Sequence, residues 1–444
     1  MSEKLLNRTP LSDEKRAALH EDLHKRPEAA VISRAVMKNG IKQASEDTAA
    51  LTRLHRTFSV ELETGRVTNQ RHSGRCWEFA TLNTLRHAMG AKYKVKDFEL
   101  SQNYLFFWDK VERANIFYDN ILNTAELPAD DRAVAAFLAR PGEDGGQWDM
   151  AASLVQKYGV VPDYVMPETA NTNDSSSFGE ALDLKLRKDA MVLRQLVHDG
   201  KDETEIAAQR QEFLSEVYRM AAYSFGEPPV SFDLEYRDDE KKYHRDENLT
   251  PQAFYDKYFD INFDDYVVLS NAPDRDFNKL YRLPSQENIV GGRPIRLLNV
   301  TLDKMKKATI DQLQDGETVW FGNDVLEQMN RSEGLLDSQL YRESELFDVD
   351  LSMTKAQRLE YGQANVSHAM TFTGVNLVNG VPNRWKVENS WGEKNGDKGY
   401  FVMADSWMND YVYEVVVNKK YLDAETLAVL DQEPTILPSW DSLA

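Results

Sequence analysis

The feature that most constrains the fold is the dipeptide Asn379–Gly380, which stands between the strand-like runs 365-NVSHAMTFTGVNLV-378 and 381-VPNRWKVENSWG-392. An Asn-Gly pair between two such runs is the strongest short-range sign of a two-residue β-hairpin. Because a two-residue turn sets the register of both strands, the pattern predicts that His368 lies opposite Trp391.

Asn389 is two residues from Trp391, so it is expected on the same face and diagonal to His368, at about 7 to 8 Å between backbones. An amide and an imidazole can bridge that gap, and the indole of Trp391 would shield the pair from water. Pro382 favours a bulge, so this register is a working assumption. An ordinary sheet histidine beside an ordinary turn asparagine explains these residues equally well.

The chain of 444 residues has a single cysteine, Cys76, which follows the polar run NQRHSGR. From Cys76 to Met89 apolar residues recur at helical spacing, and Gly90 is expected to end the helix as a C-cap glycine. A helix N-terminus carries about half a positive charge, which favours thiolate and lowers the cysteine pKa. A lone cysteine is more often an inert buried residue, but the polar, glycine-containing approach favours a nucleophile.

A thiolate nucleophile needs an imidazole partner, which in turn needs a group that orients it. Six of the eight histidines stand in charged or helical surroundings and are interpreted as surface or packing residues: His20, His24, His55, His87, His198 and His244. His72 shares the tight loop of Cys76 and is interpreted as a loop residue. The pattern therefore predicts a combination of Cys76, His368 and Asn389.

The string SGRCW, followed far downstream by SHAM and ENSWG, resembles the papain-like cysteine peptidases. The longer strings VTNQRHSGRCWEFATLN, DGGQWDM, YGVVPDYVMPET and RWKVENSWGEKNGDKGYFVM are similar to one branch, aminopeptidase C and bleomycin hydrolase. The resemblance implies that Cys76 is the nucleophile and His368 the general base and then acid. It also implies that Asn389 orients the imidazole and that Gln70 stabilises the oxyanion together with the backbone N–H of Cys76.

The same resemblance implies that Gly145, Gly146 and Gln147 form a ledge for the substrate backbone, and that no metal or organic cofactor is required. Two positions depart from the family pattern. Ser73 stands where most papain relatives have a disulfide cysteine. Glu78 stands where an apolar residue is common, and its charge is expected to oppose the thiolate or to favour basic groups of the substrate.

The expected fold class is α+β: a papain-like two-lobe fold, with a helical lobe that carries the cysteine and an antiparallel β-barrel-like lobe that carries the histidine and asparagine. The 292 residues from Cys76 to His368, about twice the papain-type interval, imply a large, mainly helical insertion. Four divisions are predicted. Residues 1–57 form a charged helical arm, and residues 58–190 form the catalytic helical lobe with Cys76. Residues 191–300 form a helical or mixed insertion, and residues 301–444 form the β-rich lobe with His368, Asn389 and the C-terminal tail.

Composition limits the partners. With 53 basic and 73 acidic residues the net charge is −20, which repels nucleic acid and anionic membranes, so neither is expected to bind. The sequence has no signal peptide and no apolar run long enough to span a membrane. A single cysteine excludes an intrachain disulfide, which fits a reducing compartment. We therefore expect a soluble, cytoplasmic protein, and the resembled branch implies self-assembly to a homohexamer.

The function expected is a cytosolic cysteine peptidase that acts through a thiolate–imidazolium pair and an acyl-enzyme, with peptides as substrates. Broad aminopeptidase action is favoured. In the branch, a tail resembling LPxWDPMGALA meets the free amine of the substrate, whereas this chain has ILPSWDSLA. Three fewer residues shorten the tail by about 10 Å, so the carboxylate of Ala444 is expected to stop short. Oligopeptide-directed endopeptidase action is therefore the alternative, and an inactive peptide-binding pseudoenzyme is disfavoured because all four catalytic positions are present.

Overall fold

The computed structural model describes residues 8–443, and the chain divides into two compact units. One unit combines the described residues up to Thr52 with Gln339–Ser352, and the other combines Arg53–Ser338 with the chain from Met353 onward. Within the described part, no helix combines the length and the apolar character needed to cross a membrane.

The smaller unit is built from short helices: α1 (Asp13–His24), α2 (Ala29–Asn39), α3 (Ile41–Ser45) and α14 (Glu343–Phe347), with α4 (Ala50–Arg53) at its end. Ser12 caps α1, because its side chain accepts a hydrogen bond from the backbone N–H of Lys15. No residue of α1 or α2 is buried. The helical pattern expected for the N-terminal arm is confirmed over these elements, and residues 1–7 lie outside the described residues.

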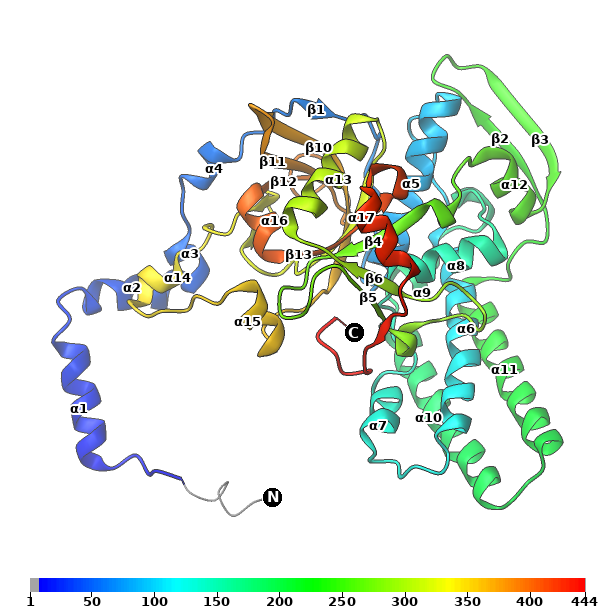
Figure 1. The fold of residues 1–444 in the computed structure, drawn as a ribbon, viewed down its shortest axis with the longest axis horizontal. Helices are drawn as coiled ribbons and strands as arrows, with labels where there is room; N and C mark the ends of the chain where they lie inside the picture. The colour runs from blue at the N-terminus through cyan, green and yellow to red at the C-terminus, as the bar shows by residue number, and fades with distance from the viewer. Residues whose placement is uncertain (1–7, 444) are drawn as a thin grey trace. The chain divides into compact units, whose positions relative to one another are not determined.

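The larger unit contains the remaining helices: α5 (Cys76–Tyr93), α6 (Gln102–Asn123), α7 (Arg132–Ala139), α8 (Trp148–Tyr158), α9 (Ala170–Asn173), α10 (Ser176–His198), α11 (Glu203–Phe225), α12 (Pro251–Tyr258), α13 (Leu302–Gln314), α15 (Lys355–Glu360), α16 (Asp405–Tyr411) and α17 (Ala424–Ala428). Helices α10 and α11 both pack against α6 (Figure 1). Helices α10 and α11 are separate because the chain turns at Gly200 and Asp202 caps α11.

The helix that begins at Cys76 is longer than predicted. The prediction that Gly90 ends it is wrong, because α5 continues to Tyr93 and ends at Lys94, which adopts the left-handed conformation (φ 55°). The backbone N–H of Lys94 donates to the carbonyl of Gly90. Glycine is needed at position 90 for another reason: a Cβ there would lie 2.9 Å from the carbonyl oxygen of Val95, where the chain passes after the turn.

Twelve strands form one sheet: β1 (Val60–Glu61), β4 (Tyr266–Ser270), β5 (Lys279–Arg282), β6 (Arg296–Asn299), β7 (Val319–Asn323), β8 (Met329–Asn330), β9 (Leu335–Leu336), β10 (His368–Val378), β11 (Val381–Glu388), β12 (Tyr400–Ala404), β13 (Val412–Asn418) and β14 (Thr435–Ile436). Its order is β14-β5-β6-β4-β13-β7-β10-β11-β12-β9-β8, with β1 beside β10. Strands β2 (Phe232–Arg237) and β3 (Tyr243–Leu249) form a separate pair.

The predicted hairpin is confirmed as β10 and β11. Asn379 and Gly380 both have positive φ, 51° and 80°, as a type I′ turn requires. The pairs next to the turn follow the predicted register, and an irregularity beside Leu377 then shifts the strands by one residue. A second irregularity, before Phe372, cancels the first, so the end of the hairpin near His368 recovers the predicted register.

Candidate active site

Cys76 is the first residue of α5, and its side chain is buried, with 8% of the residue exposed. The first backbone N–H groups of a helix have no partner within the helix, so they point outward at its tip. The backbone N–H groups of Ala369, Trp77 and Cys76 lie near the sulfur and favour its thiolate form. Because Ala369 follows His368 in β10, this contact brings the thiol beside the histidine.

His368 begins β10, where it pairs with Asn323 of the neighbouring strand β7. Asn389 follows the last residue of β11. Their side chains meet as predicted, with 2.9 Å between His368 Nε2 and Asn389 Oδ1. An amide oxygen only accepts hydrogen bonds, so the proton of a neutral imidazole lies on Nε2 and leaves Nδ1 free to accept one.

Trp391 covers this pair, as the hairpin register predicts. The ring centroids of Trp391 and His368 are 4.8 Å apart and the ring planes are tilted by 31°. The guanidinium of Arg331 lies over the same indole, 4.3 Å from its centroid. The imidazole is therefore buried, with 6% of the residue exposed.

Burial dominates the protonation of both groups. The predicted lowering of the thiol pKa is wrong: burial raises the pKa of Cys76 to about 11, against the backbone N–H groups that favour thiolate. Burial also lowers the pKa of His368 to about 4, although the hydrogen bond to Asn389 favours the charged form. Charge on either group alone is disfavoured in this dry site, whereas a proton exchanged between them leaves the net charge unchanged.

Gln70 lies in the loop before Cys76 and joins this loop to the end of the hairpin. Its Oε1 accepts from Ser390 Oγ at 2.6 Å, and its backbone N–H donates to the Ser390 carbonyl at 2.8 Å. Its Nε2 donates to the carbonyl of Ser73 at 2.7 Å. A carbonyl cannot donate, so this contact fixes the amide orientation, and the second hydrogen on Nε2 is not used by this bond.

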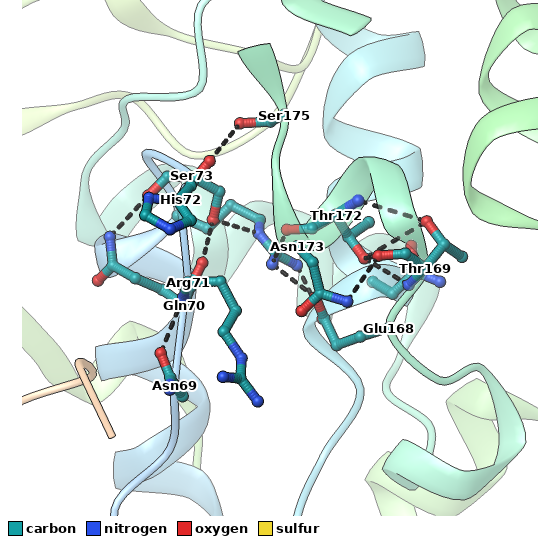
Figure 2. Close-up of polar contacts among 12 residues, drawn as sticks. Asn69, Gln70, Arg71, His72, Ser73, Glu168, Thr169, Thr172, Asn173 and Ser175 are labelled. Carbon is teal, nitrogen blue, oxygen red and sulfur yellow. Dashed lines mark hydrogen bonds and ion pairs between the residues drawn. The ribbon is translucent and has the colours of Figure 1, made fainter. Parts of the chain in front are cut away.

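The loop is held from its other side by the segment that leads into α10. The His72 N–H donates to the Asn173 carbonyl at 3.0 Å, and the His72 carbonyl accepts from the Ser175 N–H at 3.2 Å. The Ser175 hydroxyl also donates to the His72 carbonyl (Figure 2). The side chain of His72 is exposed and takes no part in these contacts, which agrees with its interpretation as a loop residue.

Arg75, the residue before the helix, is fully buried and anchors the loop by its side chain. Its guanidinium forms a bidentate ion pair with Glu168 at 2.9 and 2.7 Å. It also donates to the Thr172 carbonyl at 2.6 Å and to Ser73 Oγ at 2.9 Å. No sequence pattern predicts this contact, because Glu168 is 93 residues away from Arg75 along the chain.

Cys76 and His368 open into a cavity of about 560 Å³ whose wall includes all three residues of the predicted ledge, Gly145, Gly146 and Gln147. A Cβ on Gly146 would lie 2.6 Å from the indole of Trp77, so only glycine lets the ledge pass over that ring. The carbonyl of Gly145 accepts a hydrogen bond from the Arg113 guanidinium. The side-chain amide of Gln147 donates a hydrogen bond to the side-chain oxygen of Gln286.

The C-terminal tail reaches the same cavity, where Ser439 and Leu443 line the wall. Asp441 anchors the tail: its Oδ1 accepts from Arg275 at 2.9 Å and from the backbone N–H of Leu443 at 3.0 Å. Leu443 is buried. The tail is therefore docked, as the match of its LPxWD segment predicts, while the expected position of Ala444 lies outside the described residues.

Glu78 does not reach the cavity. It is fully buried in the first turn of α5, and neither carboxyl oxygen has a hydrogen-bond partner. Burial raises its pKa well above the ordinary value, and Asp109 raises it further. The expectation that Glu78 favours basic groups of the substrate is therefore wrong, since this carboxyl is not part of the cavity wall.

Sequence reasoning missed a different carboxyl, that of Glu414, which does line the cavity. Its signal was visible: one charge interrupts the otherwise apolar strand run YVYEVVV. Metal ligation has no support here, since no three His, Cys, Asp or Glu side chains of residues 8–443 are grouped to hold an ion.

Comparisons with known proteins find relatives over most of the chain. The profile of the Peptidase C1-like family matches residues 10–444. Aminopeptidase E of Lactobacillus helveticus is 57% identical over 424 residues, which cover 95% of this chain and 97% of the relative. Aminopeptidase G of Lactobacillus delbrueckii subsp. lactis is 54% identical and covers 94% and 95%. The crystal structure of pepW from Lactobacillus rhamnosis HN001 has a TM-score of 0.96 at 50% identity and covers 98% of both chains.

Proposed function

We propose a catalytic route and a mode of action for this chain, which belongs to the Peptidase C1-like family and is a cysteine-type peptidase with the papain-like α+β fold. In this route Cys76 is the nucleophile, His368 transfers the proton, Asn389 orients the imidazole and Gln70 stabilises the oxyanion. The single observation that carries the proposal is the shared placement of Cys76 and His368 in one cavity, with Asn389 bonded to the histidine.

The first step transfers the thiol proton to Nδ1 of His368 as the sulfur attacks the scissile carbonyl carbon. The Nε2–H bond to Asn389 leaves Nδ1 ready to receive that proton. The imidazolium then protonates the leaving amine as the C–N bond breaks, and an acyl-enzyme remains. Water, deprotonated by the same histidine, attacks the thioester and releases the acid and the thiol.

The oxyanion of each tetrahedral intermediate would be bound by two donors, the backbone N–H of Cys76 and the remaining N–H of Gln70. Both are fixed before the substrate arrives, because one belongs to the helix tip and the other to an amide clamped between Ser73 and Ser390. Such preorganised donors stabilise developing charge at little reorganisation cost. Loss of one donor of this type typically lowers kcat by about 100- to 1000-fold.

Release of N-terminal residues from peptides is the proposed mode of action. It is supported by the names of the relatives, which are aminopeptidases that match 95% and 94% of this chain. It is also supported by the docked tail, because Ser439 and Leu443 line the catalytic cavity. The tail occupies space that a longer peptide, bound across the cavity, would need. A cytoplasmic location is part of the same proposal, since the only thiol must stay reduced to act.

Alkylation of Cys76 tests the catalytic route. Because the neutral pair and the ion pair hold the same number of protons, their ratio does not change with pH between the two pKa values. Burial raises the pKa of Cys76 and lowers that of His368, so iodoacetamide should inactivate the enzyme at a rate that changes little with pH around neutrality, between these two pKa values. A rate that rises tenfold per pH unit through about pH 8 is that of an ordinary thiol and would reject the pair.

Digestion of a free-amine octapeptide beside its acetylated twin tests the mode of action. Sequential loss of single N-terminal residues, with the acetylated peptide intact, is the result expected of an aminopeptidase. Internal cleavage of both peptides would instead establish oligopeptide endopeptidase action. If the Cys76→Ala variant binds the peptide and the wild type cleaves neither, the protein is an inactive peptide-binding protein.

Self-assembly to a homohexamer is also proposed. In α2, Val31 and Met37 are 60% and 85% exposed, and apolar side chains of an amphipathic helix are normally covered by a partner surface. Light scattering measures the mass directly: a particle of one 50.9 kDa chain would contradict assembly.

A further inference from the structure

Glu414 is a carboxyl that the catalytic route does not use, although it lines the same cavity as Cys76 and His368. It lies on β13, opposite Gly322 of β7. A Cβ on Gly322 would stand 3.2 Å from Glu414 Oε2 and 3.3 Å from Val366. Glycine at position 322 therefore leaves room for the carboxyl to lie against the strand at the cavity wall.

The carboxyl of Glu414 is buried and without a partner. Only 2% of the residue is exposed, and among the residues that the structure describes none donates a hydrogen bond to Oε1. A buried carboxyl oxygen without a hydrogen-bond donor has lost its water without compensation, which is unfavourable for folding. An apolar residue would be expected at this position if the strand had only a packing role. Because the carboxyl lies at the substrate cavity, a ligand that enters the cavity can pair with it.

Electrostatics favour a cation as that ligand. Burial raises the pKa of Glu414 to about 8, and the nearby carboxyl of Asp149 raises it further. Asp149 itself is bound to Arg293 at 3.1 Å and is not available to a substrate. An arriving ammonium or guanidinium group would favour loss of the proton from Glu414 and would form a charge-assisted hydrogen bond with the resulting carboxylate.

We propose that Glu414 is a specificity-determining residue, which binds a cationic group of the peptide substrate in the catalytic cavity. The group is an ammonium or guanidinium, supplied by a lysine or arginine side chain or by the free N-terminal amine. This inference rests on the proposed role of Cys76 and extends it to the choice of substrate.

The test uses peptides that differ only in charge. Acetylated peptides carry lysine or its uncharged analogue norleucine at each of three positions before the cleaved bond. A second, free-amine series carries norleucine throughout. The wild type should prefer the cationic member at one position, and Glu414→Gln should reduce that preference by about 10-fold or more, the range of a hydrogen bond to a charged group. Its kcat/KM for uncharged peptides should stay within about twofold of wild type.

The two sources of the cation give different results. Loss of preference in the acetylated lysine series identifies a side chain, and loss in the free-amine series identifies the N-terminus. Glu143→Gln is the matched control, because it removes a carboxyl from the cavity wall at an exposed position, where solvent screens its charge. The cation preference of Glu143→Gln should equal that of the wild type.

Three outcomes would overturn the inference: no cation preference in the wild type, an equal loss for charged and uncharged peptides in Glu414→Gln, or an equal effect of Glu143→Gln. Failure of the underlying catalytic route is distinguishable, since Cys76→Ala would then still hydrolyse the norleucine peptides. Thermal unfolding of Glu414→Gln shows whether the variant is folded, and Glu414→Leu provides a second uncharged variant of similar size.

Discussion

The two sides of the catalytic site are held in place by different means. His368 and Asn389 stand at the end of a hairpin, so main-chain pairing over many residues sets their separation. Cys76 stands at the end of a short loop, whose shape depends on a few buried side chains such as Arg75. On the hairpin side, the effect of one substitution is shared among many main-chain hydrogen bonds. On the loop side, one side chain controls the position of Cys76.

The two sides are joined at two points. Arg86 of α5 pairs with Glu388, the residue before Asn389, with 2.6 Å between Nη2 and Oε1. Gln70 bonds Ser390, the residue after Asn389. Asn389 is thus held on both sides by residues that contact the cysteine-bearing helix or its loop. The site is therefore assembled by the packing of α5 on the hairpin, and neither side forms it alone.

The largest effect is expected from the groups that handle the proton. His368→Ala should lower kcat by about 10⁴-fold or more, because the general base is lost. Asn389→Ala should lower kcat by only about 10- to 100-fold, which corresponds to the loss of one or two hydrogen bonds that orient the imidazole ring. Steady-state kinetics on one peptide would give both values.

The pH profile separates the role of Asn389 from simple destabilisation. Its hydrogen bond raises the pKa of His368, so its removal should move the acid limb of kcat/KM to lower pH. An unchanged limb, or equal and mild losses in both variants, would mean that a different histidine transfers the proton.

Arg75 tests the difference between the two sides more directly. Arg75→Met removes a fully buried guanidinium and leaves Glu168 without its partner, which should cost about 3 to 5 kcal/mol of unfolding free energy. Because the loop loses its anchor, kcat should fall as well. Chemical denaturation and kinetics at low temperature measure the two effects separately.

The matched change on the hairpin side is Gly380→Ala. A Cβ there meets nothing within 4 Å, but φ is 80°, so the variant should lose about 1 to 2 kcal/mol through backbone strain alone. Its kcat should equal that of the wild type, since the turn is distant from His368 along the sheet. A larger loss of kcat in Gly380→Ala than in Arg75→Met would reverse the proposed difference between the two sides.

The same difference explains what the sequence could predict. The hairpin was predictable because Asn379–Gly380 sets a turn type. Strand pairing then extends from Val378 to Thr371, and the two irregularities within it cancel before His368. The start of α5 followed from helical spacing, but its end did not, because Lys94 adopts a conformation that is unusual for a residue with a side chain.

The contacts of the loop could not be predicted. Glu168 binds Arg75 and Asp144 accepts from the Gly74 N–H; both lie in segments between helices, and no local pattern relates them to the loop. The pKa of Cys76 was predicted in the wrong direction because the helix tip is visible in a sequence, whereas the burial that opposes it is not. Resemblance supplied the role of Gln70, and the structure supplied its two partners.

The smallest expected effect concerns Glu78, which shares the first turn of α5 with Cys76. Burial raises its pKa well above the ordinary 4.5, with Asp109 adding to the shift. Above pH 4.5 the folded protein therefore retains a proton that the unfolded chain releases, so this carboxyl lowers stability progressively as pH rises toward its folded pKa. Glu78→Gln has no charge in either state and should escape that loss.

Thermal unfolding of both proteins as a function of pH would measure this contribution. The difference in Tm, variant minus wild type, should become more positive as pH rises above 4.5, the ordinary carboxyl pKa. Glu143→Gln, which removes an exposed carboxyl at the cavity wall, is the control and should show no such trend. A difference that becomes more negative with rising pH would mean that Glu78 is ionised in the fold and stabilised there by Arg75 and Lys110. In that case the cysteine side of the site would carry a fixed negative charge next to its nucleophile.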